Sequence, residues 1–114
     1  MTIELWHNPR CSKSRSAVSL FENNGTPFKI RLYLQNAPSV SEIKKVIALL
    51  GISPRDLMRK GEAVYKELGL KDETSDAALI KAMAEHPILI ERPIGVAKTQ
   101  AVMGRPPEDL LALI

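Results

Sequence analysis

The sequence predicts an α/β fold, on three observations. The segment Thr2–His7 alternates apolar and polar residues as a strand does, and the spacing of apolar residues in Ser12–Asn24 is helical. Gly25 ends that helix, and Phe28–Leu34 then has the apolar pattern of a second strand after Pro27. A strand, a helix and a strand in succession form a βαβ unit, so we expect a parallel pair with a right-handed crossover.

The middle of the chain has the pattern of several helices. Ser39-x-x-Glu42 is a capping-box pattern, and the apolar residues after it follow helical spacing until Gly51. Ser53-Pro54 starts a short helix by the rule of a cap followed by proline. A further helix runs from Ser75 to about His86. We therefore predict a helical insertion at roughly 37–86.

The last part returns to strands. Ile88–Glu91 has the pattern of a short strand, and Ile94–Ala97 with Ala101–Met103 predicts a hairpin. A final helix starts at Pro106-Pro107, with an apolar side expected to consist of Leu110, Leu111 and Ile114. This order of elements fits a sandwich of the thioredoxin type. With 114 residues, the chain is expected to be a single domain, 1–114, that carries the insertion.

Composition and charge argue against two classes of partner. The net charge of +3 is scattered among acidic residues, and aromatic residues make up only 4% of the chain. Because a platform for single-stranded nucleic acid needs exposed rings, we expect no nucleic acid partner. No apolar stretch approaches the roughly 20 residues that span a bilayer, so we expect no membrane partner. A mild positive field favours a small anionic substrate.

Cysteine usage points to a reducing compartment. Cys11 is the single cysteine, so the chain forms no internal disulfide and has no cysteine-rich metal site. No charged segment followed by an apolar run marks a secretory signal. We therefore expect a cytoplasmic protein. We also expect a monomer that binds no metal and no cofactor.

Cys11 lies at a position that is typical of reactive thiols. It follows a strand and a tight turn, at the first turn of a helix, where unpaired amides and the helix dipole favour an anion. Arg10, Lys13 and Arg15 add positive charge, and His7 could add a charge or donate a hydrogen bond to the sulfur. The same amides could hold an oxyanion beside the nucleophile. The alternative is a buried structural cysteine.

The residue three positions after the cysteine decides how a redox cycle would close. The thioredoxin-type motif has a second cysteine there, whereas this sequence has Ser14. An adduct on Cys11 must therefore be resolved by an external thiol. Glutathione and glutaredoxin are the cytosolic candidates.

Three arginines stand at breaks in the helix and strand pattern. They are Arg59, Arg92 and Arg105. A guanidinium group offers a planar fork of permanently charged donors, which suits an oxyanion. Functional side chains are common on such connecting segments. The spacing alone does not show whether the three converge.

Together these residues resemble the glutaredoxin-dependent arsenate reductase family, the ArsC type. The segment His7–Arg15, with the letters HNPRCSKSR, is similar to the family's nucleophile loop almost letter for letter. The Arg59 break, the Glu91–Ile94 segment and the Gly104–Pro106 segment resemble its other signatures, in the expected order. The resemblance extends over essentially the whole chain.

The resemblance implies a thioredoxin-like fold and a thiol mechanism. Cys11 would be the nucleophile that forms a thiolate–arsenate ester, and His7 would favour its ionised form. The substrate-binding set would comprise Arg59, Arg92, Arg105 and Ser14. Arg92-Pro93 would be the cis-proline site of the fold. Glutathione, as co-substrate, would displace the arsenic adduct, and glutaredoxin would reduce the resulting mixed disulfide.

Three alternatives to arsenate reduction remain open. Leu57–Glu62 and Tyr65–Leu68 resemble a branch of uncharacterised reductase-like proteins within this family, in which the substrate can differ. A sister group of redox regulators binds RNA polymerase, although its C-x-x-C loop is interrupted here by Ser14. A third hypothesis is a monothiol transferase without arsenate activity.

Overall fold

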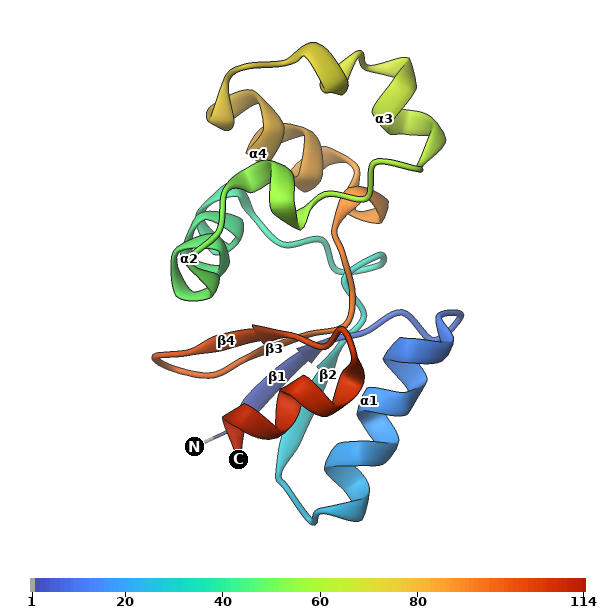
Figure 1. Cartoon of the computed structure of the whole chain (residues 1–114), viewed down its shortest axis with the longest axis vertical. Coiled ribbons are helices and arrows are strands. Elements are labelled where there is room, and N and C mark those ends of the chain that lie inside the picture. The colour runs from blue at the N-terminus through green and yellow to red at the C-terminus, as the bar shows by residue number, and fades with distance from the viewer. Residues whose placement is uncertain (1) are drawn as a thin grey trace. The chain divides into compact units, whose positions relative to one another are not determined.

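The computed structural model describes residues 2–114, which form two compact units (Figure 1). The first consists of the chain up to Asn36 together with Arg92–Ile114, and the second consists of Ala37–Glu91. The predicted insertion at roughly 37–86 lies within the second unit. The prediction of a single domain stays a prediction.

The first unit is built on a four-stranded sheet. Its strands are β1 (Ile3–Trp6), β2 (Phe28–Arg31), β3 (Ile94–Val96) and β4 (Ala101–Met103), in the order β2-β1-β3-β4. The helix α1 (Ser12–Asn23) connects β1 to β2, which pair in parallel, so the predicted βαβ unit is confirmed. The predicted hairpin is also confirmed, because β3 and β4 pair antiparallel.

The strand β2 is shorter than predicted. The sequence predicts a strand over Phe28–Leu34, but β2 ends at Arg31. The backbone turns directly after it, because the N–H groups of Gln35 and Asn36 both donate to the carbonyl of Leu32, at 2.9 Å each. The apolar residues after Arg31 therefore belong to a turn.

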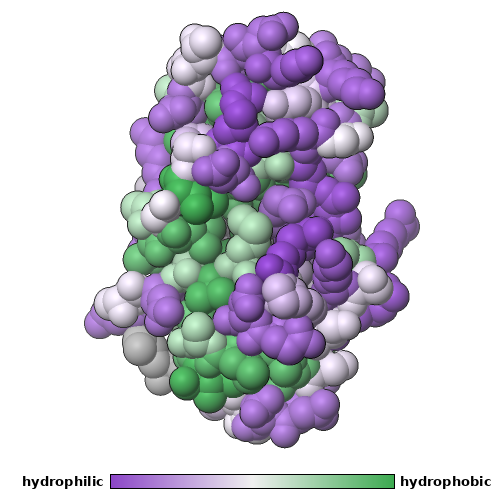
Figure 2. Space-filling view, viewed as in Figure 1, coloured by the Kyte–Doolittle hydropathy of each residue, from purple (hydrophilic) through white to green (hydrophobic). Residues whose placement is uncertain are grey.

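The core of this unit lies between the sheet, α1 and the 3-10 helix η4 (Pro107–Leu113). It consists of Ile3, Leu5, Ala17, Phe21 and Leu110, with Leu113 packed against it. The prediction that Leu110, Leu111 and Ile114 share a buried side is wrong for two of them. Leu111 is 42% and Ile114 61% exposed, and apolar residues gather on this surface over η4 (Figure 2). With three residues per turn, a 3-10 helix aligns Leu110 with Leu113 instead.

Two glycines let η4 pack closely on the hairpin. A Cβ atom at Gly95 would lie 2.5 Å from Leu113 Cδ1 and 2.9 Å from Leu110 Cδ2. A Cβ atom at Gly104 would lie 2.9 Å from both Leu110 Cδ1 and Pro93 Cγ. Any larger residue would force the side chains of Leu110, Leu113 or Pro93 to shift.

The second unit is helical. Its elements are α2 (Val40–Leu50), η1 (Pro54–Leu57), α3 (Ala63–Glu67), η2 (Leu70–Asp72), α4 (Asp76–Glu85) and η3 (Pro87–Leu89). The predicted capping box is confirmed: Ser39 Oγ accepts from Glu42 N–H at 3.1 Å, and Glu42 Oε1 accepts from Ser39 N–H at 3.0 Å. Gly51 closes α2 with a φ of 68°.

The predicted strand Ile88–Glu91 is wrong. Pro87 starts the 3-10 turn η3, and a single bridge between Ile90 and Met58 follows it. The fixed φ of proline suits the first position of such a turn. The bridge brings the segments around Arg59 and Glu91 side by side.

Arg55 fixes the irregular part of this unit. Its guanidinium donates to the hydroxyl of Tyr65 at 2.6 Å, to the carbonyl of Leu70 at 3.0 Å and to the carbonyl of Glu73. One side chain thus holds a loop that has little regular structure of its own.

Within residues 2–114, no helix combines the length and apolar character needed to cross a membrane.

Candidate active site

A tight turn carries the chain from β1 into α1. The N–H of Cys11 donates to the carbonyl of Asn8 at 3.0 Å, and the N–H of Arg10 donates to Asn8 Oδ1 at 3.0 Å. Asparagine is favoured in such turns because its side chain imitates a backbone acceptor. The sequence indicates a turn at Asn8-Pro9-Arg10, which is confirmed, but it does not reveal that the side chain of Asn8 closes it.

Cys11 is the N-cap residue of α1. Its backbone is extended, with φ −94° and ψ 123°, and its carbonyl accepts the N–H of Arg15 at 3.0 Å. The half-buried thiol makes no capping hydrogen bond, and the first turn of α1 contains no acidic residue. The first amides of a helix have no partner within the helix, and its dipole is positive at this end. This end of α1 therefore favours an oxyanion bound beside Cys11.

The hydroxyl of Ser14 ties the loop to the helix. It lies 2.6 Å from His7 Nδ1 and accepts the N–H of Asn8 at 3.0 Å. Ser14 is fully buried and His7 is 7% exposed. The sequence predicts Ser14 as a substrate-binding residue. Its burial and its two partners indicate a role in holding the nucleophile loop in place.

The surroundings of His7 favour the neutral form of its imidazole ring. Burial lowers its pKa from the ordinary value of 6.5, the hydrogen bond with Ser14 opposes this shift, and the charge of Arg15 adds to it. Of the two roles considered for His7, a positive charge beside the sulfur is therefore disfavoured. Its Nδ1 atom pairs with Ser14 and not with Cys11. A catalytic role for His7 stays a prediction.

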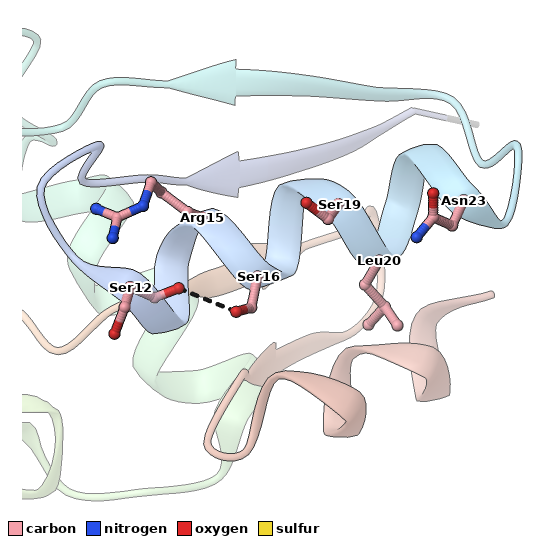
Figure 3. A pocket seen from close by; sticks show the side chains of 6 residues that line it. All are labelled: Ser12, Arg15, Ser16, Ser19, Leu20 and Asn23. Atoms are coloured by element: carbon pink, nitrogen blue, oxygen red, sulfur yellow. Dashed lines mark hydrogen bonds between the residues drawn. The ribbon is translucent and has the colours of Figure 1, made fainter.

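The cations of the loop differ in their contacts. Arg10, Lys13 and Arg15 are all exposed, and Arg15 donates through Nη1 to the carbonyl of Pro9 at 2.9 Å, which holds its guanidinium against the loop. Arg15 also borders a shallow hollow of about 420 Å³ along α1 (Figure 3). The hollow is lined by Ser12, Arg15, Ser16, Ser19, Leu20 and Asn23.

A second hollow, of about 220 Å³, lies on the loop itself. Its lining residues are His7, Asn8, Pro9, Arg10, Leu32, Leu34 and Gln35. The loop that carries Cys11 therefore borders two surface depressions. Both are open to a small solute.

The register of the sheet brings Arg92 and Arg105 to the same end as the loop. Trp6, the last residue of β1, pairs with Ile94, and Ile94 pairs with Met103. The residues just beyond these pairs are the nucleophile loop, Arg92-Pro93 and Gly104-Arg105. Two further contacts fix them: Arg105 Nε donates to the carbonyl of Arg92 at 3.2 Å, and Gly104 N–H donates to that of Pro93 at 2.8 Å.

The side chain of Arg92 has an unused donor. Its Nε atom is buried and has no hydrogen-bond partner among residues 2–114. A buried donor without an acceptor costs about 1–3 kcal/mol. An oxyanion that bound Arg92 could supply the missing acceptor. The Arg92-Pro93 bond is cis, as the resemblance implies, and the Arg105-Pro106 bond is cis as well.

Arg59 belongs to the second unit. Its N–H donates to the carbonyl of Leu89 at 2.7 Å, and its Nε atom lies 3.6 Å from Glu62 Oε2 and 3.5 Å from Glu91 Oε1. The sequence analysis missed both carboxylates as partners of Arg59. The i, i+3 spacing could have indicated Glu62, but nothing local in the sequence indicates Glu91.

The fold and the loop define a thiol protein with a single cysteine at a helix N-terminus. The model of the ArsC family matches residues 6–113, so the chain belongs to the ArsC family. The predicted thioredoxin-like α/β fold with helices is confirmed by the solved structures to which the chain is similar.

Similar proteins cover the whole chain. An arsenate reductase of Neisseria meningitidis (serogroup A) is 46% identical over 98% of this chain and 97% of that protein. The uncharacterised protein YfgD of Escherichia coli is 44% identical over 98% of this chain and 96% of that protein. The solved structure of an arsenate reductase from Vibrio cholerae is 49% identical, with a TM-score of 0.96 over 100% of this chain and 98% of that chain.

The lowered pKa of His7 predicts a pH dependence of stability. Below the ordinary value of 6.5, the unfolded chain takes up a proton that the folded chain resists. The free energy of unfolding should therefore decrease as the pH falls below about 6.5. Urea unfolding at a series of pH values measures this, alongside an NMR titration of the His7 ring.

Two variants separate His7 from the other groups. His7→Gln should lose this part of the decrease, whereas His86→Gln, which leaves the His7 ring in place, should keep it. A His7 ring that titrates above 6.5 would contradict the neutral ring described here.

Proposed function

We propose that the chain reduces arsenate to arsenite, with glutathione and glutaredoxin as the source of electrons. The observation that carries the proposal is the position of Cys11: a half-buried thiol caps α1 on a loop that Ser14 holds in place. Membership of the ArsC family and the names of the similar arsenate reductases support the choice of substrate.

The first step forms a bond between sulfur and arsenic. The thiolate of Cys11 attacks arsenate, and one hydroxyl group of the arsenate takes up a proton and leaves as water. Arsenic stays in its +5 state in the resulting ester. The amides of the first turn of α1 and the guanidinium groups would stabilise the charge on the remaining oxygens.

The second step transfers two electrons. Glutathione attacks the sulfur of Cys11, a disulfide bond forms and the sulfur–arsenic bond breaks. The electron pair of the broken bond remains on arsenic, which leaves as arsenite in the +3 state. A glutaredoxin thiol then attacks the glutathione sulfur of the mixed disulfide and returns Cys11 to its reduced form.

The cysteine count supports an external thiol. Cys11 is the single cysteine in 114 residues, and Ser14 occupies the position at which a C-x-x-C motif has its second thiol. A mechanism that closes a disulfide within the chain before reduction by thioredoxin would need another cysteine. A mechanism that uses a small thiol from solution needs no second cysteine in the chain.

The guanidinium of Arg92 supports an oxyanion as the substrate. Its buried Nε atom has no acceptor among the described residues 2–114, and the sheet register places Arg92 and Arg105 at the end where the nucleophile loop begins. A tetrahedral oxyanion presents several acceptors to such donors. Arsenate has this shape and charge.

We predict that Cys11→Ser abolishes arsenate turnover, because a serine hydroxyl is a far weaker nucleophile than a thiolate. The measurement is arsenite formation in an assay coupled to glutathione and glutaredoxin. A matched control, Cys11→Ser with Ser16→Cys, restores a thiol five positions further along the chain and should stay inactive. Turnover in Cys11→Ser would rule out the proposed mechanism.

We predict that Arg92→Lys lowers kcat/KM for arsenate roughly 10- to 100-fold. Lysine keeps the charge but loses the planar fork, and a hydrogen bond to a charged group contributes about 1.5–3 kcal/mol. The coupled assay measures the change. The reverse exchange Lys29→Arg, at an exposed position on the edge strand β2, is the control. An unchanged kcat/KM in Arg92→Lys would remove Arg92 from the site.

A further inference from the structure

The two hydrogen bonds of the Ser14 hydroxyl decide which nitrogen of the His7 ring carries a hydrogen. A serine hydroxyl has one hydrogen to donate and two lone pairs that accept. The N–H of Asn8 can only donate, so one lone pair of Ser14 Oγ accepts it at 3.0 Å. The contact of Ser14 Oγ with His7 Nδ1, at 2.6 Å, therefore uses either the hydroxyl hydrogen or the second lone pair.

The burial of Ser14 decides between these two arrangements. Its side chain is fully buried, and among residues 2–114 its hydroxyl pairs with His7 Nδ1 and with the N–H of Asn8. If Nδ1 carried a hydrogen and donated it, the hydroxyl hydrogen of Ser14 would be buried without an acceptor, which is costly. If the hydroxyl donates to Nδ1, each hydrogen has a partner. In a neutral ring, the hydrogen is then on Nε2.

The electrostatics of the ring favour the same state. Burial lowers the pKa of His7, and the charge of Arg15 adds to this shift against the opposing effect of the hydrogen bond with Ser14. A charged imidazolium would carry hydrogens on both nitrogens, so its Nδ1 would have to donate to Ser14. That arrangement leaves the hydroxyl hydrogen of Ser14 without an acceptor. Charge and hydrogen bonding therefore both favour a neutral ring with its hydrogen on Nε2.

The Nε2 atom of His7 is a donor that the chain leaves open. Within residues 2–114, the ring of His7 pairs through Nδ1 with Ser14, and Nε2 has no recorded acceptor. In the same part of the chain, the one fully buried side-chain nitrogen or oxygen without a partner is Arg92 Nε, so Nε2 is not sealed from solvent. His7 is only 7% exposed, and it borders the hollow of about 220 Å³ on the nucleophile loop.

The rest of this hollow suits an anion that has an apolar part. Arg10 adds a cation and Gln35 adds an amide, whereas Pro9, Leu32 and Leu34 form an apolar side. Among residues 2–114, no acidic side chain lines it, and all of its lining residues belong to the first unit. A carboxylate accepts hydrogen bonds from such donors, and its carbon chain can cover the apolar side. An inorganic oxyanion has no such chain.

We propose that this hollow binds the carboxylate group of a small organic ligand, with the Nε2–H group of His7 as its donor. Ser14 is a positioning residue, because its hydroxyl occupies the lone pair of Nδ1 and so keeps the hydrogen on Nε2. The ring donates to the ligand and does not accept a proton through Nε2. The site stands apart from the proposed function, because neither its donor nor its lining residues require arsenate turnover.

Nitrogen-15 NMR of the imidazole rings tests the tautomer in the whole chain. Above the ordinary pKa of 6.5, His7 should show a bare Nδ1 and a protonated Nε2. His86 is the second histidine of the chain, has no recorded ring hydrogen bond within residues 2–114, and should show the averaged signals of two tautomers. In Ser14→Ala, the signals of His7 should move toward such an average. A hydrogen on Nδ1 of the wild-type ring overturns the proposal.

Titration with butyrate, followed at the Nε2 signal of His7, tests the class of ligand. Butyrate should shift this signal saturably, and formate, which lacks the carbon chain, should bind roughly 3-fold or more weakly. Arg10→Ala should weaken the binding of butyrate roughly 2- to 5-fold, the effect of losing a pair with an exposed cation. The matched control is Lys13→Ala, which removes an exposed cation that does not line the hollow and should leave the affinity unchanged.

Three results would overturn the carboxylate site. They are the absence of a saturable shift with butyrate, equal affinities for butyrate and formate, and an equal loss of affinity in the two cation variants. S-methylglutathione, which has two carboxylates and no free thiol, identifies the source of the carboxylate: tighter binding than butyrate assigns it to glutathione, and weaker binding assigns it to a small free acid. A melting temperature confirms that each variant is folded, and the wild-type spectra judge the tautomer and the ligand without any variant.

Discussion

The buried hydroxyl of Ser14 is the constraint on which the site depends. Because it accepts the N–H of Asn8 and pairs with His7, it ties both the end of β1 and the turn after it to the first turn of α1. Cys11 is thereby held as the N-cap residue, where helix amides favour a negative charge. The chemistry proposed for the chain, attack of the Cys11 sulfur on an oxyanion held by these amides, follows from that position.

Much of the fold could be predicted from local patterns. The βαβ unit, the hairpin and the capping box at Ser39 each have a short-range signal of alternation, spacing or capping, and each is confirmed. The errors occurred where apolar residues allow more than one local structure. Ile88–Glu91 has a strand-like composition, but Pro87 starts a 3-10 turn there. In the 3-10 helix η4, buried side chains recur every three residues, whereas the prediction assumed the 3.6 residues per turn of an α-helix.

The candidate site was predictable in its residues and much less in their roles. The loop around Cys11 was found because its residues are adjacent in sequence. The burial that makes Ser14 an organiser of the loop, and His7 a neutral ring, depends on tertiary packing that no local pattern records. The partners of Arg59 are more remote still, because Glu91 reaches it through a single backbone bridge between distant segments.

The central claim is that Cys11 forms the bond to the oxyanion and is left in a disulfide with glutathione when arsenic takes up the two electrons. Mass spectrometry of the chain, after incubation with arsenate and glutathione in the absence of glutaredoxin, tests this most directly. The account predicts one glutathione attached to Cys11, in an amount that depends on arsenate. An unmodified Cys11, or the same modification without arsenate, would contradict it.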